Sequence, residues 1–186
     1  MPRAGLSTDV VVAEAARLVD LDGAGALTLR AVAESFGVAQ PSLYKHIAGL
    51  EDLHHRLALV AARDLGTAVR RAASGKATLD ALRAVATAYR HYARQHPGCY
   101  GYLLRPHADD EDHVRASTEV LEVFYDVLAG YRIVDDAQRV DATRFLRSAL
   151  HGFVTLEAAG GFAMARSVDR SFDRSVQSLD VALREW

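Results

Sequence analysis

The side chains between residues 28 and 46 are of the kinds that hydrogen-bond to nucleic acid: hydroxyls, an amide and cations. Gln40 could pair with the edge of an adenine and Arg30 with that of a guanine, because an amide and a guanidinium match the groups these bases present in the major groove. Thr28, Tyr44 and Lys45 suit phosphate contacts, which fix the register of a protein on DNA without reading its sequence. Double-stranded DNA is therefore the first ligand to consider.

Two short helices joined by a tight turn would present these side chains. Thr28 can cap a helix over residues 29–36, in which Leu29, Val32, Ala33 and Phe36 share one apolar face. Gly37 ends this helix and supplies the turn. The arrangement predicts a helix-turn-helix.

The second helix of the pair is predicted over residues 40–46. Pro41 falls at its first helical position, where a missing N–H costs nothing. Leu43 and Ile47 share a face that can pack inward, so Ser42 and Lys45 point outward. His46 lies at the flank, where bracing of the helix is the expected role.

The N-terminal residues resemble the DNA-binding domain of TetR/AcrR-family transcriptional regulators. The resemblance rests on Leu27-Thr28-Leu29-Arg30, on Gly37-Val38, and on the string from Gln40 to His46. It implies operator contacts by Arg30, Gln40, Pro41, Ser42 and Tyr44, a homodimer on a palindromic operator, and a pocket for a small-molecule effector in the C-terminal helices. The complete set of predicted DNA-binding residues is Thr28, Arg30, Gln40, Pro41, Ser42, Tyr44, Lys45 and His46.

The charge of this region departs from the family pattern. Family members usually carry a lysine after the third helix, whereas this chain has Ala48-Gly49-Leu50-Glu51-Asp52 there. Residues 1–56 hold five Arg or Lys against seven Asp or Glu, a formal charge of -2. We therefore expect few phosphate contacts and a shallow dependence of DNA binding on salt. The alternative function is a helical protein-interaction module without sequence-specific DNA binding.

Composition bounds the remaining possibilities. The chain has 186 residues, of which 50% are hydrophobic and 25% charged, and its formal net charge is -2. The single cysteine, Cys99, argues against a disulfide-stapled secreted domain. The sequence lacks an apolar run of membrane-spanning length and a signal-peptide core. We expect a soluble, cytoplasmic protein with no membrane association.

The pattern along the chain predicts an all-α fold with two domains. A helix-turn-helix domain of three helices, beginning near Ser7 or Thr8, occupies residues 1–56, and a helical ligand-binding and dimerisation domain occupies 57–186. Long helices are predicted over 50–73, from Thr78, and from Asp135 or Asp136 to about Ala159. Another ends at Gly130, and the last begins at Asp169 or Ser171.

Two C-terminal segments carry narrow apolar seams with spacings of four and three residues. Two such helices from each of two chains could form a four-helix interface, and a dimer suits a palindromic site. The alternative is that both seams are buried within one chain. The predicted interface residues are Leu146, Ala149, Phe153, Leu156, Phe172, Val176, Leu179 and Leu183. The stretch 151–162 also resembles the subgroup with a Trp-His-Gly signature, although Leu150 stands at the tryptophan position.

An effector pocket would lie among the helices after residue 78. Candidate lining residues are Tyr89, Tyr92, Cys99, Tyr100, Phe124 and His151, although ordinary core packing is the stronger explanation for any one of them taken singly. The sequence lacks a phosphate loop, a zinc motif and a nucleophile elbow, so we expect no enzyme activity and no cofactor. Residues 107–113 could hold a divalent cation loosely, but a solvated acidic loop is favoured and no metal site is predicted.

Overall fold

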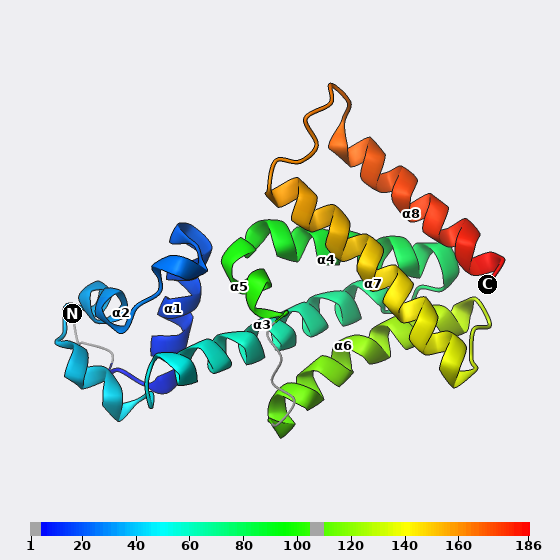
Figure 1. The fold of residues 1–186 in the computed structure, drawn as a ribbon. Coiled ribbons are helices and arrows are strands. Elements are labelled where there is room, and N and C mark those ends of the chain that lie inside the picture. The colour runs from blue at the N-terminus through cyan, green and yellow to red at the C-terminus, as the bar shows by residue number, and fades with distance from the viewer. Residues whose placement is uncertain (1–4, 105–109) are drawn as a thin grey trace. The chain divides into compact units, whose positions relative to one another are not determined.

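The all-α prediction is confirmed. A computed structural model describes residues 5–104 and 110–186, and within these ranges it contains helices and no strand (Figure 1). The elements are α1 Thr8–Asp22, η1 Ala24–Ala26, α2 Leu29–Phe36, η2 Gln40–Lys45, α3 Leu50–Ala73, α4 Thr78–Gln95, α5 Pro97–Tyr102, α6 Glu111–Gly130, α7 Asp136–Ala158 and α8 Val168–Arg184.

The chain divides into two compact units. The first comprises residues 1–62 together with 95–114, and the second comprises 63–94 with 115–186. The sequence-based division at residue 56 differs from this in one important respect. It assigned residues 95–114 to the C-terminal domain, whereas this segment packs with the N-terminal helices because α5 contacts α1.

Polar caps fix the first two helices of the N-terminal unit. The Ser7 hydroxyl accepts a hydrogen bond from the Val10 N–H at 3.3 Å and begins α1. Thr28 does the same for α2, accepting from the Ala31 N–H at 3.0 Å, as its sequence position predicted. Gly37 ends α2 in the left-handed conformation, with φ of 65°, which costs a glycine little.

The helix predicted after this turn is a 3-10 helix. η2 spans Gln40–Lys45, and the His46 N–H bonds to the Leu43 carbonyl, three residues back, at 2.8 Å. Pro41 removes one donor, and the segment is too short for an α-helical ladder, so the tighter helix is the accessible form. Leu43 and Ile47 are buried in the core of the unit, which confirms the predicted inward face.

Helix α5 closes the N-terminal unit by docking on α1. One carboxylate oxygen of Asp20 accepts the Cys99 N–H at 2.8 Å, and the other lies 2.8 Å from Nδ1 of His96. A Cβ atom at Gly98 would collide with the carbonyl of Val19, so the two backbones touch at this point. Tyr102, at the end of α5, is fully buried.

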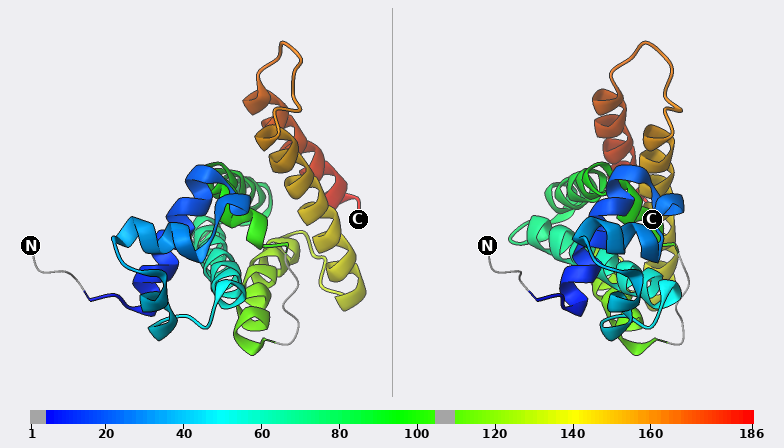
Figure 2. Two further views of the ribbon diagram at one scale, coloured as in Figure 1. Left: turned by 60° about the vertical axis from the view of Figure 1, so that its left-hand side comes forward. Right: turned by 90° about the vertical axis from the view of Figure 1, so that its left-hand side faces the viewer.

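The second unit packs α4, α6, α7 and α8 around an aliphatic and aromatic core. Leu82, Phe124, Leu146, Leu150 and Leu183 are each no more than 2% exposed. Helices α7 and α8 lie side by side as an antiparallel pair (Figures 1 and 2).

A buried arginine joins three helices of this unit. The Arg90 guanidinium on α4 donates to both carboxylate oxygens of Glu157 on α7, at 2.6 and 2.8 Å. It also donates to Asp169 on α8 at 2.7 Å, and it lies 4.7 Å from the ring centroid of Phe172. These hydrogen bonds from Arg90 hold the pKa of Glu157 below its ordinary value, although partial burial opposes the shift.

The backbone contact at Gly98 predicts the effect of a single methyl group. Gly98→Ala should lower the free energy of unfolding by about 1–3 kcal/mol, because the collision is with backbone and not with a flexible side chain. Urea denaturation followed by circular dichroism measures this change. Gly101→Ala on the same helix is the control, since its Cβ would meet open space. Equal stability of both variants would show that α5 does not dock closely on α1.

The Arg90 cluster predicts a stability that depends on pH. The pKa of Glu157 in the folded protein lies below its ordinary value of 4.5. The ionised carboxylate therefore stabilises the fold fully above pH 4.5, and this stabilisation is lost as the pH falls through the pKa of the folded state. Glu157→Gln should therefore cost about 1–2 kcal/mol near neutral pH and progressively less in acid. Urea unfolding across acidic and neutral pH tests this, with Glu185→Gln, at the exposed residue that follows α8, as the control. A cost independent of pH would contradict the assignment.

Candidate DNA interface

Helix α2, the turn and η2 place most of the predicted DNA-binding side chains in solvent. Thr28, Arg30, Gln40, Pro41, Tyr44 and Lys45 are exposed, whereas Ser42 and His46 are half-buried. Tyr44 is a large side chain that is 54% exposed, which is unusual for an aromatic residue beside a fully buried Leu43. The arrangement leaves hydroxyl, amide and cationic groups available for a ligand.

Arg30 is engaged in the free protein. Its Nε donates to Glu34, one turn further along α2, at 2.7 Å, and both side chains are well exposed. The hydrogen bond to Glu34 raises the pKa of the guanidinium. The spacing of four residues on one helix is a known signal for ion pairs, so the sequence carries a signal for this partner of Arg30. A base edge would have to compete with Glu34 for Arg30.

The other cations of residues 5–62 follow the same pattern, with one exception. Arg17 pairs with Glu14 at 2.6 Å, and Arg56 pairs with Asp52 at 2.9 Å. Lys45, on η2, has no ion-pair partner among the described residues. It is therefore the cation of this region whose charge is fully available to a phosphate.

Two contacts brace the far end of η2. The backbone carbonyl of His46 accepts the Thr8 hydroxyl at 2.8 Å, which ties the end of η2 to α1. Asp52 accepts the Ala48 N–H at 2.8 Å and holds the start of α3. Partial burial raises the pKa of Asp52, but the hydrogen bonds from the Ala48 N–H and from Arg56 lower it by more. The pKa of Asp52 therefore lies below its ordinary value. Asp52 thus has structural partners at the start of α3.

The candidate effector residues are distributed over both units. Tyr89, Tyr92 and Phe124 are buried in the second unit, and His151 is half-buried there. Cys99 and Tyr100 belong to α5 in the first unit, where the Cys99 thiol lies 3.7 Å from the Ala16 carbonyl. The six residues therefore do not form one cluster within either unit, and their contact with a ligand stays a prediction.

Most of the predicted interface residues are packed inside the protomer. Leu146, Phe172, Val176, Leu179 and Leu183 are no more than 6% exposed. Ala149 and Phe153 are half-buried, and Leu156 remains accessible at 52% exposure. These five side chains are largely covered within one chain, and contact with a second chain stays a prediction for the predicted interface residues. The sequence pattern of an apolar helix face is the same whether the face packs within one chain or between two chains.

Residues 107–109 of the acidic segment lie outside the described residues. Asp110 accepts the His113 N–H at 2.6 Å and lies 3.1 Å from Nε2 of His55. No group of three potential metal ligands occurs within 5–104 and 110–186. In the same ranges, none of the helices has the length and apolarity needed to span a membrane.

The sequence of this chain is similar to those of known transcriptional regulators. Residues 82–179 match the family description "Tetracyclin repressor-like, C-terminal domain". Over 159 residues, the chain is 36% identical to an uncharacterised HTH-type transcriptional regulator of Mycobacterium tuberculosis, covering 84% of this chain and 72% of that protein. The chain belongs to the TetR family.

The TetR-family fold extends over the whole chain. A protein of unknown function from Rhodococcus sp. RHA1 superposes with a TM-score of 0.83 at 22% identity, covering 99% of both chains. A TetR variant from Acinetobacter baumannii AYE, solved in complex with minocycline, superposes with a TM-score of 0.71 at 22% identity, covering 97% of this chain and 98% of that one. The family is one of transcriptional regulators and not of enzymes.

The Arg30–Glu34 pair predicts a variant that binds DNA more tightly. Glu34→Gln should raise DNA affinity about 1.5- to 5-fold at low salt, because it frees Arg30 and removes a negative charge beside the phosphates. Fluorescence anisotropy with labelled duplex measures the change. Glu14→Gln, which breaks the equivalent pair with Arg17 on α1, is the matched control. Weaker binding by Glu34→Gln would show instead that Glu34 orients Arg30 for base contact.

Proposed function

We propose that this TetR-family protein is a repressor that binds a palindromic operator as a homodimer and is released by a small-molecule effector. The observation that carries the proposal is the exposure of Arg30, Gln40, Tyr44 and Lys45 on a helix-turn-helix whose inward Leu43 is fully buried. Gln40 and Arg30 supply base contacts, and Tyr44 and Lys45 supply phosphate contacts. A protein bound over a promoter represses transcription by excluding polymerase, with no further contact needed.

A dimer fits the exposed apolar residues of the last two helices. Phe145 and Leu156 on α7 are 37% and 52% exposed, and Val181 on α8 is 61% exposed. Trp186 follows α8 and lies 5.5 Å from the Phe145 ring centroid. A second chain packed on these helices would cover these side chains, and burial of apolar surface between chains stabilises a dimer. Two recognition elements about 34–36 Å apart would then match successive major grooves.

The effector is proposed to act through the segment between α4 and α6. Tyr89, Tyr92 and Phe124 surround the interior of the second unit, and the minocycline complex of the Acinetobacter protein supports a small-molecule ligand for a chain of this fold. Helix α5 follows α4 directly in the chain and docks on α1 through Asp20. A ligand that prefers another arrangement of α4 and α6 would thereby reposition α1. Complete switching, from 1:99 to 99:1, takes a differential affinity of about 5.5 kcal/mol.

A gel-shift titration against the DNA upstream of the protein's own gene tests the proposal. The protein should bind specifically in excess nonspecific competitor. Arg30→Ala should cost about 1–3 kcal/mol of binding and relax the preference at one base pair. Arg17→Ala is the control, because Arg17 has a similar ion pair on the same unit but lies outside the helix-turn-helix.

Further arms of the titration separate the parts of the proposal. A duplex with one half-site should bind far more weakly than the palindrome, and Val181→Asp should remove that difference if α8 forms the dimer. Absence of specific binding at low salt, in a genome-wide fragment selection as well, would favour the protein-interaction module. Uniform loss of affinity across sequences in Arg30→Ala would restrict Arg30 to a phosphate contact.

A further inference from the structure

The C-terminal end of η2 lies beside the side chains proposed to contact phosphate. The last carbonyl groups of a helix have no hydrogen-bond partner within that helix. Tyr44 and Lys45 are the final residues of η2, and His46 follows them as its C-cap. The carbonyl of His46 accepts the Thr8 hydroxyl from α1 at 2.8 Å. The end of η2 is therefore capped by a side chain that is 38 residues away in the sequence.

The donor of this hydrogen bond stands on a well-anchored helix. The Ser7 hydroxyl caps α1 by accepting the Val10 N–H, and Val11 is fully buried in the core of the unit. Thr8 is the first residue of α1, between these two anchors in the sequence, and is itself half-buried. Thr8 therefore presents its hydroxyl to η2 from a rigid support.

The acceptor lies on an element that has fewer restraints of its own. Helix η2 has six residues, and a 3-10 helix has poorer hydrogen-bond geometry than an α-helix. Its apolar anchors, Leu43 and Ile47, are buried on one face, and apolar contact is not directional. Such packing resists separation of η2 from the core more than it resists rotation of η2 about its own axis. Asp52 holds the later Ala48 N–H to α3, whereas the bond to His46 acts on the end of η2 itself.

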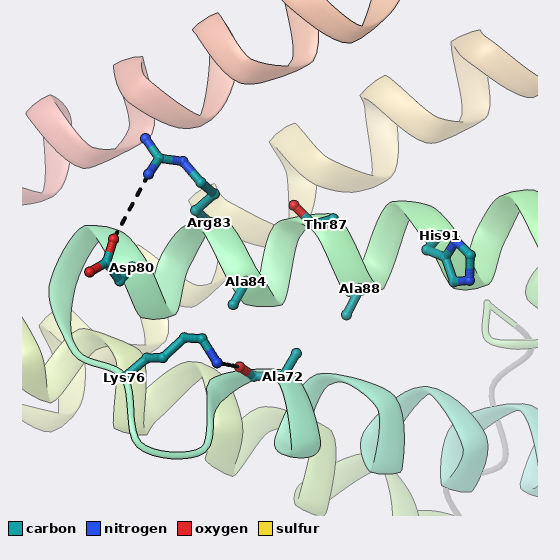
Figure 3. A pocket seen from close by; sticks show the side chains of 8 residues that line it. All are labelled: Ala72, Lys76, Asp80, Arg83, Ala84, Thr87, Ala88 and His91. Atoms are coloured by element: carbon teal, nitrogen blue, oxygen red, sulfur yellow. Dashed lines mark hydrogen bonds and ion pairs between the residues drawn. The ribbon is translucent and has the colours of Figure 1, made fainter.

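A lysine at the end of α3 shows the contrast with a local cap. The Lys76 ammonium donates to the Ala72 carbonyl at 2.9 Å, beside a groove of about 600 Å³ along α4 (Figure 3). Because Lys76 follows Ala72 by four residues in the same segment, this bond caps α3 alone. The Thr8 bond joins two different helices and so fixes the direction of one relative to the other.

We infer that Thr8 is a positioning residue for DNA recognition, which holds Tyr44 and Lys45 in place through the carbonyl of His46. The inference rests on the proposed function, because it assigns a role in the binding of DNA by η2. Specific binding uses phosphate contacts at fixed positions to set the register of the protein on DNA, whereas nonspecific binding requires mainly charge. Loss of the Thr8 hydroxyl should therefore weaken specific binding much more than nonspecific binding.

Three variants on the first turn of α1 and its cap test the inference. Thr8→Val removes the hydroxyl at nearly constant shape, and Thr8→Ser retains it. Ser7→Ala is the matched control, because it removes the neighbouring cap of α1 without altering the bond to His46.

Fluorescence anisotropy compares their affinities for the duplex from upstream of the protein's own gene and for a scrambled duplex of the same composition. Thr8→Val should lower the ratio of specific to nonspecific affinity by about fivefold, which corresponds to the net loss of one hydrogen bond. Thr8→Ser and Ser7→Ala should leave this ratio close to that of the wild type.

Hydrogen exchange without DNA gives a second readout, which does not depend on the proposed function. The N–H groups of His46 and Ile47 both donate to the Leu43 carbonyl, so their exchange reports opening of the end of η2. Exchange in a peptide over residues 43–49 should be faster in Thr8→Val than in the wild type, Thr8→Ser or Ser7→Ala. A peptide over residues 53–61 of α3 should exchange equally in all four proteins, which excludes global unfolding as the cause.

Two results would overturn the inference. Equal exchange of residues 43–49 in Thr8→Val and Ser7→Ala would show that Thr8 supports only α1. Equal loss of affinity for both duplexes in Thr8→Val would show that Thr8 contacts phosphate directly. Absence of any preference between the duplexes in the wild type would count against the proposed function, whereas the exchange data would still decide whether Thr8 holds η2.

Discussion

The contact of Gly98 with Val19 is the constraint around which the N-terminal unit is organised. It brings two helices to backbone distance, and Asp20 then satisfies the N–H of Cys99 at the start of α5. Because the contact involves backbone atoms, it leaves no flexible side chain to absorb a displacement. Helix α5 is thereby fixed to the same α1 on which α2 packs.

The second unit depends on a different kind of constraint. Arg90 is 9% exposed, and its charge is balanced by Glu157 and Asp169 from two other helices. Removing Glu157, whose side chain is only 17% exposed, would leave the buried charge of Arg90 poorly compensated, which costs more than the pair itself contributes. The planar guanidinium also stacks on Phe172, so geometry as well as charge fixes where α8 begins.

Local signals predicted the helices well and their partners poorly. Caps and glycine breaks placed α1, α2 and α3, because those signals act within a few residues. The turn at Gly37 and the burial of Leu43 and Ile47 followed from the spacing of apolar residues. Arg90 and Glu157 are 67 residues apart, and no pattern in one sequence links them. The seam of α7 and α8 was visible, but whether it is covered by the same chain depends on tertiary packing.

The sequence predicted which side chains of the candidate site are exposed, but not which of them form ion pairs in the free protein. Arg30 and Gln40 were identified by their types and by the family resemblance, whereas the pairing of Arg30 with Glu34 emerged only from the structure. Residues 1–56 have a formal charge of -2. Three of their acids, Glu14, Glu34 and Asp52, are paired with arginines, and Lys45 stays available to a phosphate.

The N-terminal unit is discontinuous in sequence, since it combines residues 1–62 with 95–114. Its recognition surface is therefore not a portable module that can be excised at the end of a helix and joined to another regulator. A chimera joined within α3 would combine this α1 with the α5 of another protein. That α5 has not evolved to pack against Val19 and Asp20. Exchange of operator specificity between such proteins is thus easier by replacing surface residues of α2 and η2 than by grafting whole domains.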